Sequence, residues 1–236
     1  MPLLSVRNLN VVLGGQSILE DISFDVEPGQ SFAIVGPNGA GKTVLLRALL
    51  GLVPYTGDVR WEKDARIGYV PQKLDFDYYL PISLGDFLYA KAKVLGLPGD
   101  AVLELLPTVG FTKQMLSARL GTLSFGQFQK SLIVFGLLGN PDMLFLDEAT
   151  LGVDMPYESH VYDILDRLRK EKRVTIVMVS HELEIVYRYT TQVLCLNRRM
   201  VCVGSPKEAL TEKTLKELYR ESTFYVHHHE GHGGSV

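Results

Sequence analysis

The residues whose types and spacing best suit chemistry form a glycine-rich stretch, VGPNGAGKTVLL, from Val35 to Leu46. The stretch fits the pattern G-x-x-x-x-G-K-T, in which glycines let several backbone N–H groups turn toward one anion at the positive end of a helix. Lys42 would reach the β and γ phosphates of a nucleotide, and the Thr43 hydroxyl would ligate magnesium. An ordinary glycine turn is the alternative, but the apolar run before the stretch and the helical pattern after it favour a phosphate loop. The expected nucleotide contacts are Gly36, Pro37, Asn38, Gly39, Ala40, Gly41, Lys42 and Thr43.

Two carboxylates follow a second apolar run, MLFLDEAT, from Met143 to Thr150. The four apolar residues predict a buried strand that ends at the carboxylates. Asp147 at the strand end can hold magnesium through water, and Glu148 can polarise an attacking water. Acidic residues also cap strands that run into helices. A carboxylate pair after an all-apolar strand favours hydrolysis, with Glu148 as the catalytic residue.

Strands and helices must bring these side chains together, and the hydrophobic pattern predicts such elements. Ile22, Phe24 and Val26 alternate with polar residues, which indicates a half-exposed strand. An all-apolar run from Phe32 to Val35 indicates a buried strand just before the glycine-rich stretch. Because strands then alternate with helices, we predict an α/β fold with a largely parallel sheet covered on both faces. The remaining expected elements are a helix at 42–50, strands at 58–61 and 67–70, a helix at 127–138, a strand at 143–147, a helix at 157–171, a strand at 174–180 and a hairpin at 193–204.

The composition narrows the class of protein. With 236 residues, 46% of them hydrophobic and 22% charged, the chain can bury a sizeable core and is expected to form one domain. The segment 82–119 is helical in pattern and is expected to form a separate lobe. The net charge of −3 gives no general basic field, so nucleic acid is not favoured as a partner. No apolar run approaches the ~20 residues of a membrane helix, so any membrane role must come through a partner.

The two cysteines, Cys195 and Cys202, lie in the stretch VLCLNRRMVCVG, which predicts two short strands around a turn. In one register of such a hairpin the two side chains face each other. Because the chain has no secretory signal, we expect two buried thiols rather than a disulfide or a metal site.

Further short motifs lie around the glycine-rich stretch and the MLFLDEAT strand. A Leu-Ser-x-Gly-Gln element at 123–127 lies one helix before the MLFLDEAT strand. YVPQ stands at 69–72, LGVD at 151–154 and VSHEL at 179–183. In this order and spacing, across nearly the whole chain from about Leu3 to Ser205, the sequence resembles the ATP-binding cassette ATPases.

The resemblance implies a RecA-like P-loop core, an N-terminal antiparallel β-subdomain and an inserted helical lobe at about 74–127. It implies a single domain over 1–222, followed by a histidine-rich tail at 223–236. ATP and Mg²⁺ are the implied cofactors, and two chains would enclose two ATP molecules head to tail as a homodimer.

Roles for further residues follow from the same resemblance. Gln72 would sense the γ-phosphate and magnesium, and His181 would contact the γ-phosphate. The alternatives are a polar residue at a strand end for Gln72, and a helix cap for His181 and for Ser124. The residues implied to contact the partner's nucleotide, or to lie at the dimer site, are Ser124, Gly126, Gln127 and Asp154.

Three positions depart from the pattern of the family. Phe125 replaces the first glycine of the Ser-Gly-Gly signature, but Gly126 is kept, so closure of the dimer is expected. Ala149 stands where a proline usually follows the catalytic Glu, and it removes no ligand. Leu13 occupies the position that commonly stacks an aromatic ring on adenine. It can pack against a base without offering a ring, which leaves base selectivity open.

Within the family, the sequence is most similar to the ATPase subunits of bacterial zinc and manganese importers. The similarity lies in RIGYVPQKLDFDYYLPISLGDFL at 66–88 and in VLCLNRRMVCVGSPKE at 193–208. It implies integral membrane permease subunits as partners, a metal-binding extracytoplasmic protein in the same system, and a place on the cytoplasmic face of the membrane. Candidates for the surface that meets the permease are Phe76, Tyr78, Tyr79 and Leu80, with the core of the helical lobe as the alternative for each.

The tail carries four histidines in a short run, His227, His228, His229 and His232. Neutral imidazoles bind zinc, so a regulatory zinc site is one hypothesis. A disordered end or the remnant of a purification tag is the other, although HHHEGHGG is no regular six-histidine tag.

The expected function is therefore that of an ATPase that powers the import of zinc or manganese, in which ATP closes the dimer and hydrolysis at Glu148 resets it. A cassette protein of DNA repair would need a coiled coil between Lys42 and Ser124, and that interval is too short for one. Cassette proteins of translation usually carry two cassettes. A cassette of a lipid or efflux system, and a metal-binding module with a merely structural nucleotide site, remain as alternatives.

Overall fold

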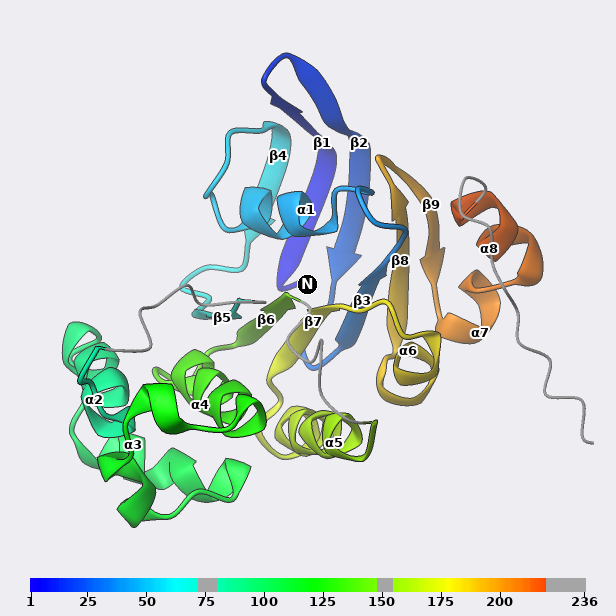
Figure 1. The fold of residues 1–236 in the computed structure, drawn as a ribbon. Coiled ribbons are helices and arrows are strands. Elements are labelled where there is room, and N and C mark those ends of the chain that lie inside the picture. Colours follow the sequence, from blue (N-terminus) through cyan, green and yellow to red (C-terminus); the bar gives the residue numbers. More distant parts are fainter. Residues whose placement is uncertain (72–79, 148–154, 220–236) are drawn as a thin grey trace, which may run out of the picture.

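The computed structural model describes residues 1–71, 80–147 and 155–219. Within these residues the strands form two sheets, with a group of helices to one side (Figure 1). The strands are β1 (Leu4–Leu13), β2 (Gln16–Val26), β3 (Ser31–Val35), β4 (Thr56–Trp61), β5 (Ile67–Val70), β6 (Met143–Asp147), β7 (Thr175–Val179), β8 (Gln192–Asn197) and β9 (Arg199–Gly204). The α-helices are α1 (Lys42–Leu49), α2 (Leu84–Val94), α3 (Asp100–Leu105), α4 (Phe125–Leu137), α5 (Met155–Lys172), α6 (Leu183–Tyr189), α7 (Pro206–Ala209) and α8 (Glu212–Leu218). Short 3₁₀ helices are η1 (Leu106–Val109), η2 (Lys113–Ser117) and η3 (Leu120–Thr122).

The central sheet has the strand order β5-β6-β7-β3-β8-β9. Its first five strands run parallel, and β9 returns antiparallel beside β8. Every residue of β3, β6 and β7 is buried, as their apolar runs predicted. The expectation of a largely parallel α/β sheet is confirmed.

Two separate cores lie on the two faces of this sheet. In β3, Phe32 and Ile34 point into a core shared with β1, β2 and α1. Ala33 and Val35 point into the other core, which includes α4, α5, α6 and the helical lobe. Because side chains alternate along a strand, a fully apolar strand is what two covered faces require.

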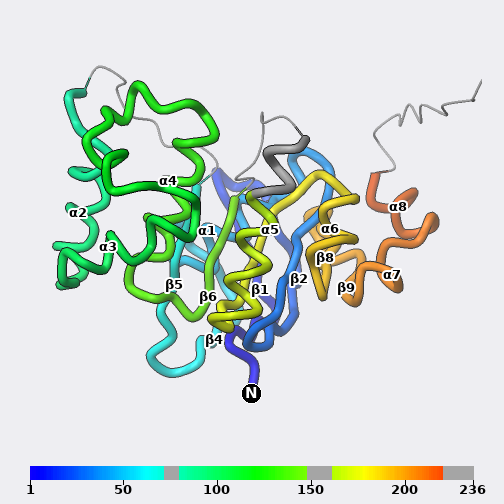
Figure 2. Tube along the Cα trace, turned by 90° about the horizontal axis from the view of Figure 1, so that it is seen from below, coloured from blue at the N-terminus to red at the C-terminus, as the bar shows by residue number. Residues whose placement is uncertain are grey.

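The N-terminal sheet is antiparallel, in the order β2-β1-β4, as expected. The helical lobe contains α2, α3, the 3₁₀ helices and the start of α4, and it lies at the opposite end of the molecule from α7 and α8 (Figure 2). Backbone hydrogen bonds close the lobe, from Leu84 N–H to the Ala118 carbonyl at 2.8 Å and from Leu120 N–H to the Ile82 carbonyl at 3.0 Å.

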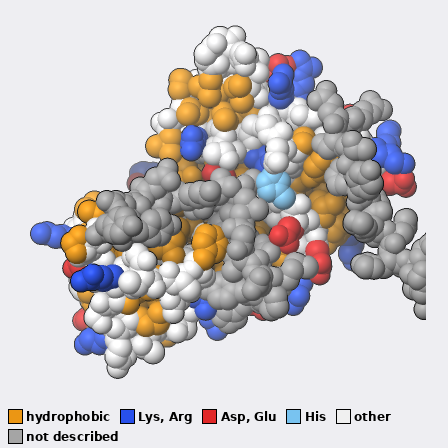
Figure 3. Space-filling view, in the orientation of Figure 1, with side chains coloured by type: hydrophobic (Ala, Val, Ile, Leu, Met, Phe, Trp, Pro, Cys, Tyr) orange, Lys and Arg blue, Asp and Glu red, His pale blue; other side chains and the backbone are white. Residues whose placement is uncertain are grey.

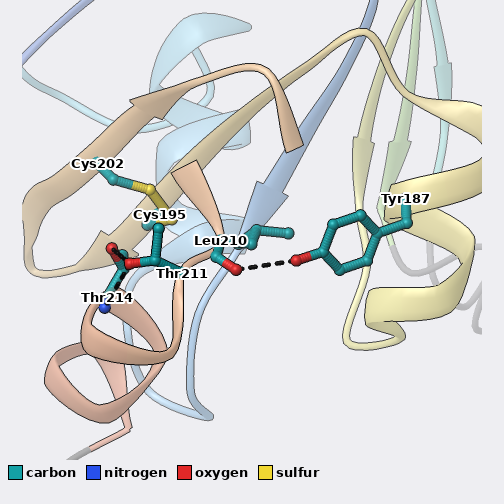
Figure 4. The surroundings of a disulfide bond; sticks show 6 residues. All are labelled: Tyr187, Cys195, Cys202, Leu210, Thr211 and Thr214. Atoms are coloured by element: carbon teal, nitrogen blue, oxygen red, sulfur yellow. Dashed lines mark hydrogen bonds between the residues drawn. A yellow bond between two sulfur atoms is a disulfide. The ribbon is translucent and has the colours of Figure 1, made fainter. Parts of the chain in front are cut away.

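The expectation of two free thiols is wrong. β8 and β9 pair with Cys195 directly opposite Cys202, and the two sulfurs form a disulfide (Figure 4). The two Cα atoms are 4.8 Å apart, which lies within the range that a disulfide spans. The sequence left the register of the hairpin open, and the register decides whether the side chains meet.

Candidate functional site

The candidate site lies at the carboxyl ends of three parallel strands of the central sheet. β3 leads through the glycine-rich loop into α1, β6 ends at Asp147, and β7 is followed by Ser180 and His181. In open α/β sheets, this edge is where ligands bind. The sheet thus brings the phosphate loop, Asp147 and His181 to one edge.

Glycine is required at two places in the loop. A Cβ on Gly36 would lie 2.0 Å from the backbone oxygen of Leu196, so no other residue fits there. Gly41 has φ 95°, in the left-handed region, and is the N-cap of α1 without a side-chain cap. The first N–H groups of α1 are therefore not capped by a side chain at its N-cap, which suits them to an anion.

Lys42 lies inside the loop. Its side chain is almost fully buried, and its ammonium donates to the carbonyls of Gly36 at 2.9 Å and Pro37 at 3.0 Å. The loop therefore holds a positive charge at its centre, where the β and γ phosphates of a nucleotide are expected.

Asp147 is held by hydroxyl groups from two sides. Thr43 Oγ1 donates to Asp147 Oδ1 at 3.1 Å, and the Tyr69 hydroxyl donates to Asp147 Oδ2 at 3.4 Å. Burial raises the pKa of Tyr69, and the charge of Asp147 raises that pKa further, so the phenol keeps the proton that it donates. A hydroxyl and a carboxylate are oxygen ligands of the kind that Mg²⁺ prefers, so the two residues fit that ion.

Tyr69 was not among the predicted site residues. It stands in the YVPQ motif, in which only Gln72 received a role. The contact between β5 and β6 that brings Tyr69 to Asp147 depends on their order in the sheet, which the motif alone does not give.

The signature residues lie elsewhere, at the start of α4 in the helical lobe. Ser124 Oγ accepts from the N–H of Gln127 at 3.3 Å, and Gln127 Oε1 accepts from the N–H of Ser124 at 3.0 Å. This capping box confirms the helix-cap interpretation of Ser124 and leaves its role toward a nucleotide a prediction. Phe125 is 47% exposed and Gly126 is buried. The lobe lies to one side of the central sheet, away from the phosphate loop of the same chain (Figure 1).

His181 and Leu13 lie near the ends of their strands. His181 is half-buried and follows β7, and the next residue, Glu182, donates its N–H to Ser180 Oγ at 3.1 Å. Leu13 ends β1 beside Val12, which is 57% exposed. In the view of Figure 3, hydrophobic side chains gather just below the end of the β1–β2 hairpin.

Several predicted site residues lie outside the described residues. They are Gln72, Glu148, Asp154, His227, His228, His229 and His232, together with Phe76, Tyr78 and Tyr79 of the candidate partner surface. Ala149, which departs from the family pattern, also lies outside them. Among the residues that are described, no group of three or more His, Cys, Asp or Glu could hold a metal ion.

Together, the doubly covered parallel sheet and the phosphate loop define a P-loop nucleotide-binding domain with an added antiparallel sheet and helical lobe. The ABC transporter family model matches residues 19–151. The chain belongs to the ABC transporter family, as an ATPase subunit, and the predicted family and fold class are confirmed.

Curated relatives and solved structures agree with this assignment. A zinc import ATP-binding protein, ZnuC, of Pseudomonas fluorescens is 39% identical over 97% of this chain and 88% of its own length. CbiO1 of Clostridium perfringens, part of an ABC transporter complex, superposes with a TM-score of 0.79 at 27% identity, over 92% of this chain and 93% of its own. An inward-facing metal-chelate type ABC transporter gives a TM-score of 0.84 at 24% identity, over 93% of this chain and 90% of its own, and supports the fold.

Proposed function

We propose that this chain is the ATP-hydrolysing subunit of an importer for a divalent metal ion, with zinc favoured over manganese. The observation that carries the proposal is the 39% identity to a zinc import ATP-binding protein along nearly the whole chain. The phosphate loop and the Thr43–Asp147 pair supply the parts needed to bind ATP.

In this proposal the chain's own residues divide the work at the nucleotide. Backbone N–H groups of the loop and the Lys42 ammonium hold the β and γ phosphates. Thr43 and Asp147, with Gln72, hold Mg²⁺, which when bound neutralises part of the phosphate charge. Glu148 orients the attacking water, and His181 contacts the γ-phosphate.

Two copies of the chain would complete each other's sites. Ser124 is exposed at the start of α4, and that helix end lies in a lobe to one side of the chain's own loop. A head-to-tail homodimer would bring Ser124, Gly126, Gln127 and Asp154 of one copy to the nucleotide of the other. We include the division into one domain over 1–222 and a tail over 223–236 in this proposal.

The helical lobe offers a surface for the permease. A hollow of about 680 Å³ lies between α2 and α4, with Phe87 and Phe135 stacked at 4.6 Å between ring centroids. The Lys91 ammonium lies 4.2 Å from the Phe135 ring centroid and donates to the Phe135 carbonyl. Leu80, a predicted partner residue, is 46% exposed at the entry to the lobe. An apolar groove of this kind suits an amphipathic helix of a membrane subunit.

This docking would place the chain on the cytoplasmic face of the membrane, beside a permease that receives metal from an extracytoplasmic protein. In the described part of the chain, no helix has the length and apolar character needed to cross a bilayer.

Uptake of radioactive zinc tests the proposal in cells that lack the chain and are complemented with it. We expect zinc uptake to be restored by the wild type and not by Glu148→Gln. Excess manganese should compete poorly if zinc is the cargo. Normal zinc uptake without the chain, together with loss of another transported solute, would assign it to a different ABC system.

A further inference from the structure

The two cysteines lie beside the phosphate loop. β8 pairs in parallel with β3, and this pairing sets Cys195 opposite Val35, the residue directly before Gly36. On its other side β8 pairs with β9, where Cys195 is joined to Cys202 (Figure 4). The disulfide is therefore one strand away from the beginning of the loop.

The hairpin of β8 and β9 also supports the loop directly. The Leu196 carbonyl fills the space that a side chain on Gly36 would need. At the tip of the hairpin, the Arg198 N–H donates to the Ala40 carbonyl at 3.0 Å, and the Arg198 carbonyl accepts from the Glu20 N–H at 2.9 Å. Arg198 has φ 58°, a left-handed conformation that residues with a side chain seldom adopt. Contacts around the tip must therefore hold it in place.

β9 pairs with another strand on one side only, and it also packs against β2, α7 and α8. It is the last strand in the order of the sheet, so its ladder hydrogen bonds go to β8. The ladder is irregular directly after Cys195, where the register shifts. The exposed Arg199–Glu20 ion pair adds little, because water screens it. The disulfide thus joins the two strands at the last pair before the register shift, and the pairs Leu196–Met200 and Asn197–Arg199 lie between it and the tip.

We propose that Cys195 and Cys202 form a reversible disulfide that controls how firmly the phosphate loop holds ATP. With the disulfide closed, the tip of the hairpin is fixed against the loop. With it open, β9 can shift along the irregular ladder, and the Arg198–Ala40 hydrogen bond is held less often. The reduced chain therefore binds ATP more weakly than the oxidised chain.

The two cysteines differ in solvent exposure, and this difference decides which sulfur a small thiol attacks in thiol–disulfide exchange. Cys195 is fully buried and Cys202 is half-buried, so a small thiol such as glutathione attacks the sulfur of Cys202. The protein disulfide breaks, Cys195 leaves as a thiolate and takes up a proton, and a mixed disulfide forms on Cys202. A second small thiol releases Cys202, so two thiols reduce the protein and become one small disulfide. In the reverse direction, the small disulfide is the oxidant.

Titration of the full-length chain with ATP and Mg²⁺ by calorimetry, in the oxidised and the reduced form, tests the proposal. Alkylation followed by mass spectrometry verifies the form, since the reduced chain takes two alkyl groups and the oxidised chain none. We expect Kd for ATP to rise about three- to tenfold on reduction, the loss expected from weakening one backbone hydrogen bond at the loop.

Cys202→Ser is the matched control, because it removes the half-buried partner of the pair and leaves Cys195 in place. It should bind ATP like the reduced wild type under both conditions. Equal ATP affinity of the two wild-type forms would overturn the proposal, even if reduction lowers the unfolding temperature, because that result describes a merely structural disulfide. A redox response that persists in Cys202→Ser, or a wild-type chain that stays alkylatable in excess oxidised glutathione, would also overturn it.

Discussion

The phosphate loop and the groove of the helical lobe each contain a lysine, but the two regions are built in opposite ways. In the loop, the Lys42 ammonium donates to two backbone carbonyls, and the backbone of Leu196 lies so close to Gly36 that no side chain fits there. In the groove, Lys91 lies over an aromatic ring between apolar side chains, and burial lowers its pKa to about 8.

The difference teaches which surfaces a sequence reveals. A loop that binds phosphate through its backbone needs glycine and lysine at fixed spacing, so it can be recognised in the amino-acid sequence. A groove that binds a partner through apolar side chains uses the same residue types as a core, so its pattern is not distinctive. Substitutions in the two regions should therefore separate nucleotide chemistry from partner binding.

The largest expected effect is that of Glu148→Gln. The substitution keeps the size of the side chain and removes the carboxylate that orients water, so turnover should fall ~100-fold or more while ATP binding is retained. Steady-state phosphate release and an ATP titration of the same preparation measure the two quantities. A hydrolysis rate equal to that of the wild type would show that Glu148 does not orient the attacking water.

Lys42→Ala should weaken ATP binding itself by about ten- to a hundredfold, because it removes a charged donor to the phosphates. Lys91→Ala is the matched control in the groove, and it should leave the ATP affinity of the isolated chain unchanged. Calorimetric titration measures the ATP affinity of both variants. An equal loss of ATP affinity in the two would show that the loop and the groove do not differ in nucleotide binding.

Tyr69→Phe should have a smaller effect, about two- to fivefold, since it removes one long hydrogen bond to Asp147 and keeps the ring. We expect a higher Mg²⁺ concentration for half-maximal hydrolysis and an unchanged ATP affinity without Mg²⁺. A fall in unfolding temperature with no change in Mg²⁺ dependence would assign Tyr69 to packing alone.

Lys91→Met should change how the stability of the folded chain depends on pH. In the folded chain the pKa of Lys91 is about 8, against the usual 10.5, so the folded state disfavours the charged ammonium. The destabilisation caused by burying the charged ammonium is fully present below about pH 8. It is relieved between about pH 8 and pH 10.5, because in that range the unfolded chain binds the proton and the folded chain does not. The stability of the wild type relative to Lys91→Met should therefore rise between about pH 7.5 and pH 9.5, as thermal unfolding of both chains would show.

The smallest expected effect concerns the tail. His227, His228, His229 and His232 should bind zinc weakly and lose it below about pH 6, as the imidazoles take up protons. Zinc at micromolar concentration should alter hydrolysis by the assembled transporter, whereas a chain ending at Phe224 should not respond. The same zinc response in both chains would leave these histidines without a regulatory role.

Periodicity and turn chemistry predicted the elements around the loop, because each depends on neighbours in sequence. α1 and β5 begin where their patterns indicated, and β6 has the expected bounds. α4 begins at Phe125 rather than at Gln127, since Ser124 and Gln127 form a capping box that starts the helix two residues earlier. The pattern S-x-x-Q carried that signal in the sequence.

Contacts between distant segments were not predictable in the same way. The Tyr69–Asp147 hydrogen bond, the Arg198–Ala40 hydrogen bond and the disulfide each depend on strand order or register. A single sequence does not fix these, because a shift of one residue turns every side chain of a strand to the other face. The roles of the residues at 72–79 and 148–154 stay predictions.

The division of β3 between two cores has a consequence for how the chain opens. Phe32 and Ile34 anchor the strand on one face, while Ala33 and Val35 anchor it on the other. Freeing β3 from its neighbours would require both cores to separate, so its amides should exchange with solvent only in global unfolding. The phosphate loop thus follows a strand whose amides should exchange most slowly. Local fraying at the ends of the chain should not reach Gly36, the first residue of the loop.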